Sequence, residues 1–135
     1  MPHRGEVWFV ELSMAEKPRP ALIISSDYGD KDRALITIVP HTTALRGSEF
    51  EVGIQARFLD RRGAFMVQSV TTIPSFKAKR CVGVLTKQQL ATVEEKIRIW
   101  LASNYHLAAQ IADSGLRNPS AFPPRAQPNA FRRCD

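Results

Sequence analysis

The sequence predicts a mainly β protein: a small barrel of short strands followed by one C-terminal amphipathic helix. Between residues 6 and 85, runs of β-branched and aromatic residues alternate with turn clusters, which favours a barrel over stacked βαβ units. After residue 86 the apolar residues recur every three or four positions, as in a helix. A length of 135 residues is enough for one small domain with its own core. We expect this domain over residues 1–112.

Six strands are expected before the helix, each bounded by turn clusters. Their ranges are 6–12, 21–26, 34–39, 49–54, 64–70 and 80–85. The clearest alternation lies in 49–54, where Phe50, Val52 and Ile54 share one face. This face is therefore predicted to point into the core. Glycines and carboxylates of the kind that tight connections require gather at 27–30, 46–48 and 60–63.

The helix is expected to begin after Thr86, because Thr86 and Gln89 have the spacing of a capping box. The apolar stripe predicted to pack on the barrel consists of Leu90, Val93, Ile97, Trp100 and Leu101. The face predicted to meet water carries Glu94, Glu95 and Arg98. A second helical stretch is expected at 105–112.

The composition changes at residue 113. The segment 113–135 holds four of the nine prolines, four arginines and few aliphatic side chains. Such a segment buries too little apolar surface to offset the entropy of ordering it, so it is expected to be a disordered basic tail. Two interpretations stay open: a solvated extension without a role, and a basic arm that adds non-specific RNA affinity.

Charge and cysteine usage indicate a cytoplasmic protein with an anionic partner. The formal net charge of +6 favours a polyanion such as a nucleic acid without establishing one. Cys81 and Cys134 lack metal-ligand spacing relative to His3, His41 and His106, so we expect two free thiols and no metal site. No apolar leader and no run of about 20 apolar residues is present, which predicts no membrane partner.

Two segments combine an apolar run with a polar group at its end: residues 19–26 (RPALIISS) and 39–43 (VPHTT). If neighbouring strands bring Arg19 and Thr42 together, a guanidinium fork and a hydroxyl can bind a phosphate group. On pattern alone the simpler interpretation is a solvated charge at a strand entry and an ordinary turn hydroxyl.

These two segments, together with 4–12, 50–52 and 82–86, resemble the MazF/PemK family of bacterial toxins, which are sequence-specific endoribonucleases. The resemblance covers about residues 4 to 101. It implies an SH3-like barrel of the PemK/CcdB type that acts as the toxin of a type II toxin–antitoxin system. It also implies cleavage of single-stranded RNA through the 2′-hydroxyl without metal or cofactor. A homodimer and a cognate antitoxin, with an acidic segment over the RNA groove, are the expected protein partners.

The resemblance assigns Arg19 and Thr42 to the active site, but the chain departs from the family pattern nearby. Many relatives carry Arg and Asp on the strand before the Ile-Pro step, where this sequence has Met66 and Gln68. Gln68 cannot abstract a proton, although its amide can position a phosphate or read a base edge. We therefore keep Gln68 as a catalytic candidate in a positioning role.

The sequence leaves the identity of the general base open. His41 stands beside Thr42, and imidazole titrates near neutrality, but neighbouring residues of a strand point to opposite faces. Glu16 precedes Arg19 in the first loop, residues 13–18, which is shorter than in many relatives.

RNA-contacting residues are expected near loops and strand ends, where aromatic and cationic side chains can stack on bases or bind phosphates. The candidates are Tyr28, Thr43, Arg46, Phe58, Ser69, Lys77, Lys79 and Arg80. Solvated loop residues are the alternative interpretation for most of them.

Two other functions compete with the ribonuclease. A gyrase inhibitor of the CcdB type shares the fold, but CcdB contacts gyrase through residues that end its chain, whereas this chain continues into a Pro/Arg tail. A catalytically degenerate RNA-binding member is favoured by the missing Arg and Asp.

Overall fold

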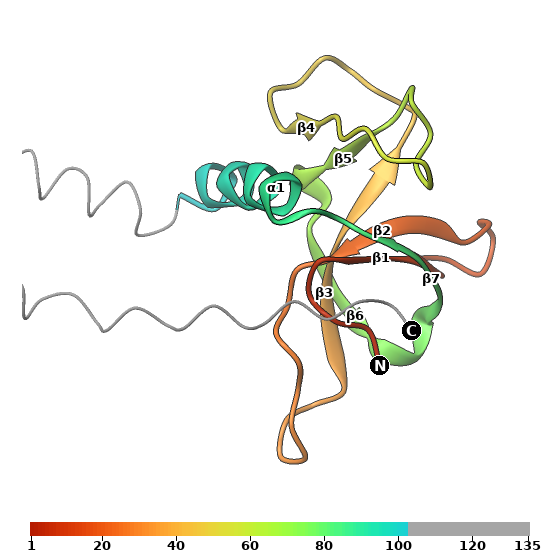
Figure 1. The fold of residues 1–135 in the computed structure, drawn as a ribbon. Coiled ribbons are helices and arrows are strands. Elements are labelled where there is room, and N and C mark those ends of the chain that lie inside the picture. Colours follow the sequence, from red (N-terminus) through yellow and green to blue (C-terminus); the bar gives the residue numbers. More distant parts are fainter. Residues whose placement is uncertain (103–135) are drawn as a thin grey trace, which may run out of the picture.

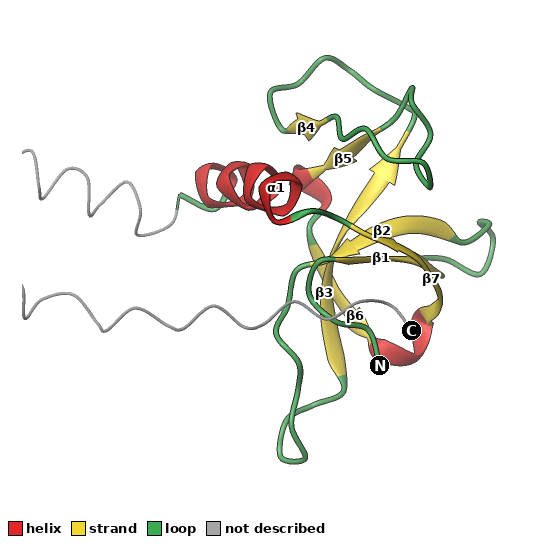
Figure 2. Ribbon diagram, in the orientation of Figure 1, coloured by secondary structure: helices red, strands yellow, loops and turns green. Residues whose placement is uncertain are grey.

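The computed structural model describes residues 1–102, and within them the protein is mainly antiparallel β-sheet with one helix at the C-terminal end (Figures 1 and 2). The strands are β1 (Glu6–Val10), β2 (Arg19–Ile23), β3 (Leu35–Thr42), β4 (Glu51–Val52), β5 (Ala64–Met66), β6 (Thr71–Pro74) and β7 (Ala78–Val84). The helices are the 3-10 turns η1 (Val67–Ser69) and η2 (Ser75–Lys77) and the α-helix α1 (Lys87–Trp100). The predicted fold class is confirmed.

The sheet is organised around β3. Its strand order is β4-β5-β3-β2-β1-β7, and β6 also pairs with β3. The first half of β3 pairs with β6, its last two residues pair with β5, and β2 lies along its middle. One long strand therefore joins both parts of the sheet. Because β5 and β6 both pair with β3, the segment that connects them runs along the edge of β3.

All six predicted strands differ from the observed strands in their bounds. The strand predicted at 34–39 continues to Thr42, because its last two residues pair with β5. The strand predicted at 21–26 begins at Arg19 and ends at Ile23. Two further predictions are wrong in most of their extent. The expected strand 64–70 ends at Met66, because the chain turns there through η1 to reach the other half of β3. In the expected strand 49–54 only Glu51–Val52 is paired, although Val52 and Ile54 are buried and Phe50 packs against them as predicted. The sequence prediction also missed β6, a short edge strand that ends in Pro74.

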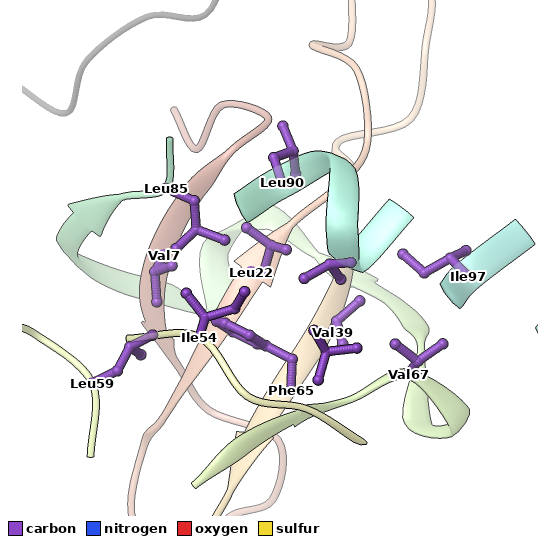
Figure 3. Close-up of a cluster of buried hydrophobic side chains, with 12 residues drawn as sticks. Val7, Leu22, Val39, Ile54, Leu59, Phe65, Val67, Leu85, Leu90 and Ile97 are labelled. Atoms are coloured by element: carbon purple, nitrogen blue, oxygen red, sulfur yellow. The ribbon is translucent and has the colours of Figure 1, made fainter. Parts of the chain in front are cut away.

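Two hydrophobic clusters lie on the two faces of the sheet. The larger is covered by α1 and consists of Val7, Leu22, Val39, Val52, Ile54, Leu59, Phe65, Val67, Leu85, Leu90, Val93 and Ile97 (Figure 3). The smaller lies on the opposite face and consists of Val10, Ala21, Ile23, Ile36, Ile38 and Ile73. Consecutive residues of β2 alternate between the two clusters, as period-two side-chain geometry requires.

The helix begins as predicted, but the last residues of its predicted apolar stripe are exposed. Thr86 Oγ1 accepts a hydrogen bond from Gln89 N at 3.1 Å, and Gln89 Oε1 accepts one from Thr86 N at 2.9 Å, which confirms the capping box. Of the predicted stripe, Leu90, Val93 and Ile97 are buried. Trp100 and Leu101 are 40% and 58% exposed, because the helix ends there. The Trp100 and Phe50 rings meet edge-on, at 5.2 Å between their centroids.

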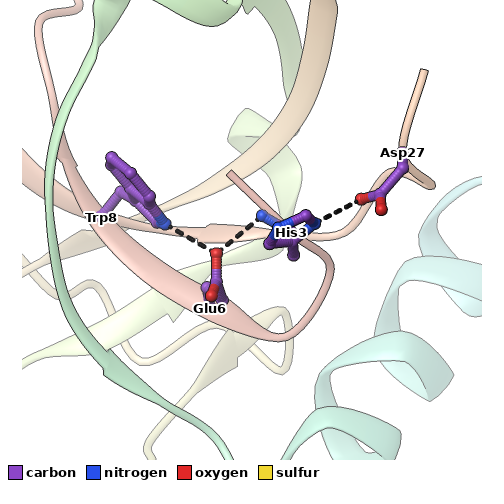
Figure 4. Close-up of polar contacts among 4 residues, drawn as sticks. All are labelled: His3, Glu6, Trp8 and Asp27. Carbon is purple, nitrogen blue, oxygen red and sulfur yellow. Dashed lines mark hydrogen bonds and ion pairs between the residues drawn. The ribbon is translucent and has the colours of Figure 1, made fainter. Parts of the chain in front are cut away.

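A buried carboxylate fixes the N-terminal end of the sheet (Figure 4). Glu6 is 1% exposed, and its Oε1 accepts hydrogen bonds from His3 N at 2.7 Å and Trp8 Nε1 at 3.0 Å. His3 Nδ1 lies 2.8 Å from Asp27 Oδ1 in the loop that follows β2. The two donors compensate the burial of the Glu6 charge, so this cluster is structural.

Several predictions concern cysteines or residues beyond 102. Cys81 takes part in a disulfide bond, so the predicted free thiol at this position is wrong. Cys134, His106, the second helical stretch at 105–112 and the tail at 113–135 lie outside the described residues, as does the predicted domain boundary at 112. Among residues 1–102, no helix is long and apolar enough to cross a membrane.

Candidate active site

A pocket of about 370 Å³ opens on the face of the sheet opposite α1. It is lined by Leu12, Arg19, Pro40, Thr42, Met66, Ser69, Thr71 and Ile73. The lining combines one cation and three hydroxyl groups with an apolar wall. A volume of this size and mixed character is typical of a small-ligand site.

Arg19 and Thr42 reach the pocket because of the register between β2 and β3. Ala21 lies opposite Pro40, so the same register carried two residues further sets Arg19 opposite Thr42. Side chains opposite one another on one face lie about 5 Å apart at their Cβ atoms. Arg19 begins β2 and Thr42 ends β3, so the two groups stand together at one end of the sheet.

Met66 and Ser69 enter the pocket because β5 ends early. The chain has to cross from β5 to β6 beside β3, and η1 makes this crossing. Ser69 Oγ donates to Met66 Sδ at 2.8 Å. Thr71, opposite Ile38 at the start of β6, completes the wall. The crossing thus supplies two further hydroxyl groups that face the same space as Thr42.

Arg19 carries the positive charge of the pocket and is held only loosely. Its Nε lies 3.8 Å from Glu16 Oε2, and the two side chains are 48% and 52% exposed. Exposed pairs of this kind contribute about 0–1 kcal/mol. An incoming phosphate can therefore replace Glu16 as the partner of the guanidinium at little cost, while the carboxylate stays beside it.

Thr42 is oriented more tightly. Its side chain is only 7% exposed, and its Oγ1 accepts a hydrogen bond from Ala44 N at 3.1 Å. A hydroxyl has one donor hydrogen and two acceptor lone pairs, so this contact leaves the hydrogen available for another acceptor. Thr42 is thus a preorganised donor at the pocket, next to the charge of Arg19.

His41 points away from the pocket into the barrel. It is 4% exposed, and its ring meets Phe65 edge-on at 5.0 Å between centroids. A Cβ atom at Gly63 would lie 2.3 Å from His41 Cε1, so only glycine fits beneath the ring. Among the described residues, Nε2 has no hydrogen-bond partner. Burial lowers the pKa of His41 below 6.5, partly offset by the nearby Asp60 carboxylate, so the neutral ring is favoured in the folded state.

The burial of His41 predicts that the protein loses stability in mild acid. Because the folded-state pKa lies below 6.5, the unfolded chain binds the extra proton more readily, and the free energy of unfolding falls as the pH drops below about 6.5. Urea unfolding between pH 7.5 and 5.5 measures this slope. We expect a shallower slope for His41→Leu, which removes the titrating group; an unchanged slope would contradict the assignment. Asp60, whose pKa is lowered to about 2 by the Arg62 side chain, stays ionised throughout this range.

The remaining catalytic and aromatic candidates lie apart from the pocket lining. Gln68 is exposed on η1 between two lining residues. Tyr28 is half-buried against the smaller cluster, and its hydroxyl lies 3.0 Å from Ser75 Oγ. Phe58 packs over Gly83, where a Cβ atom would come within 2.3 Å of the ring. Phe58 and Tyr28 thus have structural contacts.

The other candidates for RNA contact lie on two surfaces. Thr43 and Arg46 are exposed in the loop after β3, where Arg46 N donates to Glu51. Around the start of β7, Lys77 is half-buried in η2 and Lys79 Nζ lies 3.7 Å from Glu11 Oε2. Arg80, which also lies near the start of β7, stacks over the ring of Phe9. Of all eight candidates, Ser69 is the one that lines the pocket.

Sequence reasoning missed several lining residues. Thr71 was overlooked because β6 was not expected, so nothing placed it opposite β3. Leu12, Pro40 and Ile73 are apolar, and none of them was a candidate for the site. The signal that could have located Thr71 is the run of β-branched residues before Pro74, which is short but typical of an edge strand. Within residues 1–102, no three His, Cys, Asp or Glu side chains gather as ligands for a metal ion.

Comparison with known proteins agrees with this fold. Residues 3–101 match the family described as PemK-like, MazF-like toxin of type II toxin-antitoxin system. An endoribonuclease from a mycobacterial species, solved with its cognate antitoxin, is 20% identical, with a TM-score of 0.65 over 76% of this chain and 96% of that one. The Mycobacterium tuberculosis toxin MazF-mt6 is 26% identical, with a TM-score of 0.61 over 72% and 96%.

MazF in the MazE-MazF complex of Deinococcus radiodurans is 20% identical, with a TM-score of 0.63 over 76% of this chain and 97% of that one. No curated protein matches the sequence significantly. The antiparallel sheet with its C-terminal helix is a MazF-like fold. The family match covers most of the chain, and the protein belongs to the PemK-like, MazF-like toxins of type II toxin-antitoxin systems.

Proposed function

We propose that this protein is an endoribonuclease toxin that cleaves single-stranded RNA without a metal ion. The observation that carries the proposal is the pocket in which Arg19, Thr42 and Ser69 stand together. Charged and hydroxyl donors on one side suit a phosphate, and the apolar wall of Leu12 and Ile73 suits a base or sugar. Family membership and the endoribonuclease relatives support the same activity.

The reaction needs little from the protein, because RNA carries its own nucleophile. The 2′-hydroxyl loses its proton as its oxygen attacks the adjacent phosphorus, the bond to the 5′-oxygen breaks, and that oxygen takes up a proton from solvent. A 2′,3′-cyclic phosphate and a 5′-hydroxyl result. Negative charge builds on the non-bridging oxygens during attack. Arg19 and Thr42 would donate to these oxygens, and donors fixed in advance give the largest benefit at that stage.

The 2′-hydroxyl proton needs an acceptor, and we assign this role to Glu16. Its carboxylate lies 3.8 Å from the Nε atom of Arg19, which lines the pocket, whereas the His41 ring is enclosed on the other face of the sheet. No carboxylate or imidazole stands among the lining residues themselves. Gln68, exposed on η1, is proposed to contact the substrate at the pocket rim.

The activity is tested by incubating the purified protein with a long RNA in excess EDTA and mapping the ends. Discrete cuts that leave 2′,3′-cyclic phosphate or 3′-phosphate ends are expected, and the cut positions would define the recognition sequence. Intact RNA under conditions in which the protein still arrests growth would contradict the nuclease. Such a result would favour a protein target such as gyrase.

Replacing Thr42 by alanine is expected to lower the cleavage rate by one to two orders of magnitude. The variant loses one preorganised donor, and removing such a donor typically costs about 10²-fold. Thr42→Ser keeps the hydroxyl and should retain most of the rate. Single-turnover cleavage of a defined RNA measures the effect. Equal losses in the alanine and serine variants would show that the methyl group, and not the hydroxyl, is what matters.

By the same family resemblance, we propose that the protein forms a homodimer and is neutralised by a cognate antitoxin. Relatives have been solved with their antitoxins, including the mycobacterial endoribonuclease and MazF with MazE from Deinococcus radiodurans. The net charge of +6 would attract an acidic antitoxin segment by the same electrostatics that attract RNA.

A further inference from the structure

Arg80 and Phe9 form a cation–π pair on adjacent strands. They lie opposite one another in the register of β1 and β7, which run side by side (Figure 1). The Arg80 Cζ atom is 5.1 Å from the centroid of the Phe9 ring. In the part of the chain that the structure describes, no carboxylate pairs with Arg80, whereas its neighbour Lys79 is paired with Glu11. Arg80 thus combines a planar, exposed guanidinium with an uncompensated charge.

This pair lies on the opposite face of the sheet from the pocket. Phe9 is two residues from Val7, which belongs to the cluster beneath α1, so both side chains lie on that face. Pro20 is opposite Phe9, and Arg19 is opposite Val10. Because Arg19 and Pro20 are adjacent on β2, they point to opposite faces. The pocket and the Arg80–Phe9 pair are therefore back to back at the same end of the β1–β2 hairpin.

We propose that Arg80 and Phe9 form a stacking platform for a nucleotide of the same RNA strand, outside the pocket. An arginine plane supported by an aromatic ring can stack on any base, and its charge attracts the backbone phosphates. Since the two sites are back to back, the strand would leave the pocket and bend around the hairpin end, past the exposed Lys17. The inference rests on the proposed function, and it adds a requirement for substrate length that the pocket alone does not impose.

The test compares binding of short and long RNA. Fluorescein-labelled, fully 2′-O-methylated RNA pools of 4 and 20 nucleotides cannot be cleaved through the 2′-hydroxyl, so anisotropy reports binding alone. Arg80→Ala is expected to raise the Kd of the 20-mer about tenfold and to leave that of the 4-mer within twofold. Arg80→Lys keeps the positive charge but lacks the planar guanidinium group. It should therefore show most of the loss of 20-mer affinity that is expected for Arg80→Ala. Arg33→Ala, which removes an exposed arginine elsewhere, is the matched control and should change neither value appreciably.

The outcomes separate this inference from the proposed nuclease. Loss of 20-mer affinity in Arg80→Ala supports the platform even if the protein cuts no RNA. An unchanged 20-mer affinity, or equal losses for both lengths, overturns the platform even if cleavage is observed. Full recovery by Arg80→Lys also overturns it, because charge alone would then explain the effect. Binding of an acidic peptide that requires Arg80 while RNA binding does not would assign the surface to a protein partner.

Discussion

Arg19→Ala is expected to reduce the rate of RNA cleavage by about 10³-fold or more while the protein remains folded. Arg19 is the one cation among the lining residues of the pocket, and an arginine that stabilises charge in a phosphoryl transition state is worth about 10³-fold or more. Its side chain is 48% exposed and contributes little to the core. Single-turnover cleavage of a defined RNA measures the loss, and circular dichroism with thermal unfolding checks the fold.

Three variants make this result interpretable. Arg57→Ala removes an exposed arginine from a loop away from the pocket and should cleave at the wild-type rate. Arg19→Lys keeps the charge but loses the planar fork, so it should recover only part of the rate. Glu16→Gln leaves Arg19 in place and should still bind RNA while its rate falls, if Glu16 accepts the proton. Wild-type cleavage by Arg19→Ala would remove Arg19 from the active site.

The sequence predicts the barrel well because its strands carry their own signal. The alternation of Phe50, Val52 and Ile54 and the capping box at Thr86 are local patterns, and the structure confirms both. The end of the helix was harder to predict. The apolar stripe continues to Leu101, but burial depends on what faces the last turn, and no spacing in the helix reveals that.

The pocket could be predicted only in part. Arg19 and Thr42 were candidates because of their motifs and the family resemblance, although both lay outside the predicted strands 21–26 and 34–39. The register of β2 against β3, which sets them beside one pocket, comes from the structure. The position of Ser69 depends on η1, a three-residue turn. In the sequence, the segment from residue 64 to 70 looks like one continuous strand. The position of Thr71 depends on which part of β3 pairs with the following strand, β6. Such tertiary choices leave little trace in local sequence.

The position of His41 illustrates how alternation and tertiary packing combine. Period-two geometry was sufficient to argue that His41 and Thr42 face opposite sides of β3. It did not reveal that the His41 ring would fill the space above Gly63 and meet Phe65. That contact ties the turn at 60–63 to the end of β3, where Thr42 lies. The buried ring is therefore better understood as support for the pocket than as its base.

Gly63→Ala is accordingly expected to weaken both the fold and the activity. The added Cβ atom would lie 2.3 Å from His41 Cε1 and 2.9 Å from Thr42 O, so the ring and the backbone of β3 both have to move. Overpacking of this kind typically costs about 1–3 kcal/mol. Urea unfolding measures the stability, and the cleavage rate should fall because Thr42 is displaced. Gly53→Ala is the matched control, since a Cβ atom there meets nothing within 4 Å.

A double-mutant cycle with His41→Ala distinguishes a specific clash from a general defect of the turn. Removing the ring relieves the 2.3 Å contact, so the alanine at position 63 should cost less in that background. Coupling energies between touching residues are typically about 0.5–3 kcal/mol. Rescue should be incomplete, because the approach to the Thr42 carbonyl oxygen remains. Additive losses of stability would mean that His41 does not stabilise the turn at 60–63. The backbone pairing of β3 with β5 would then be what positions Thr42.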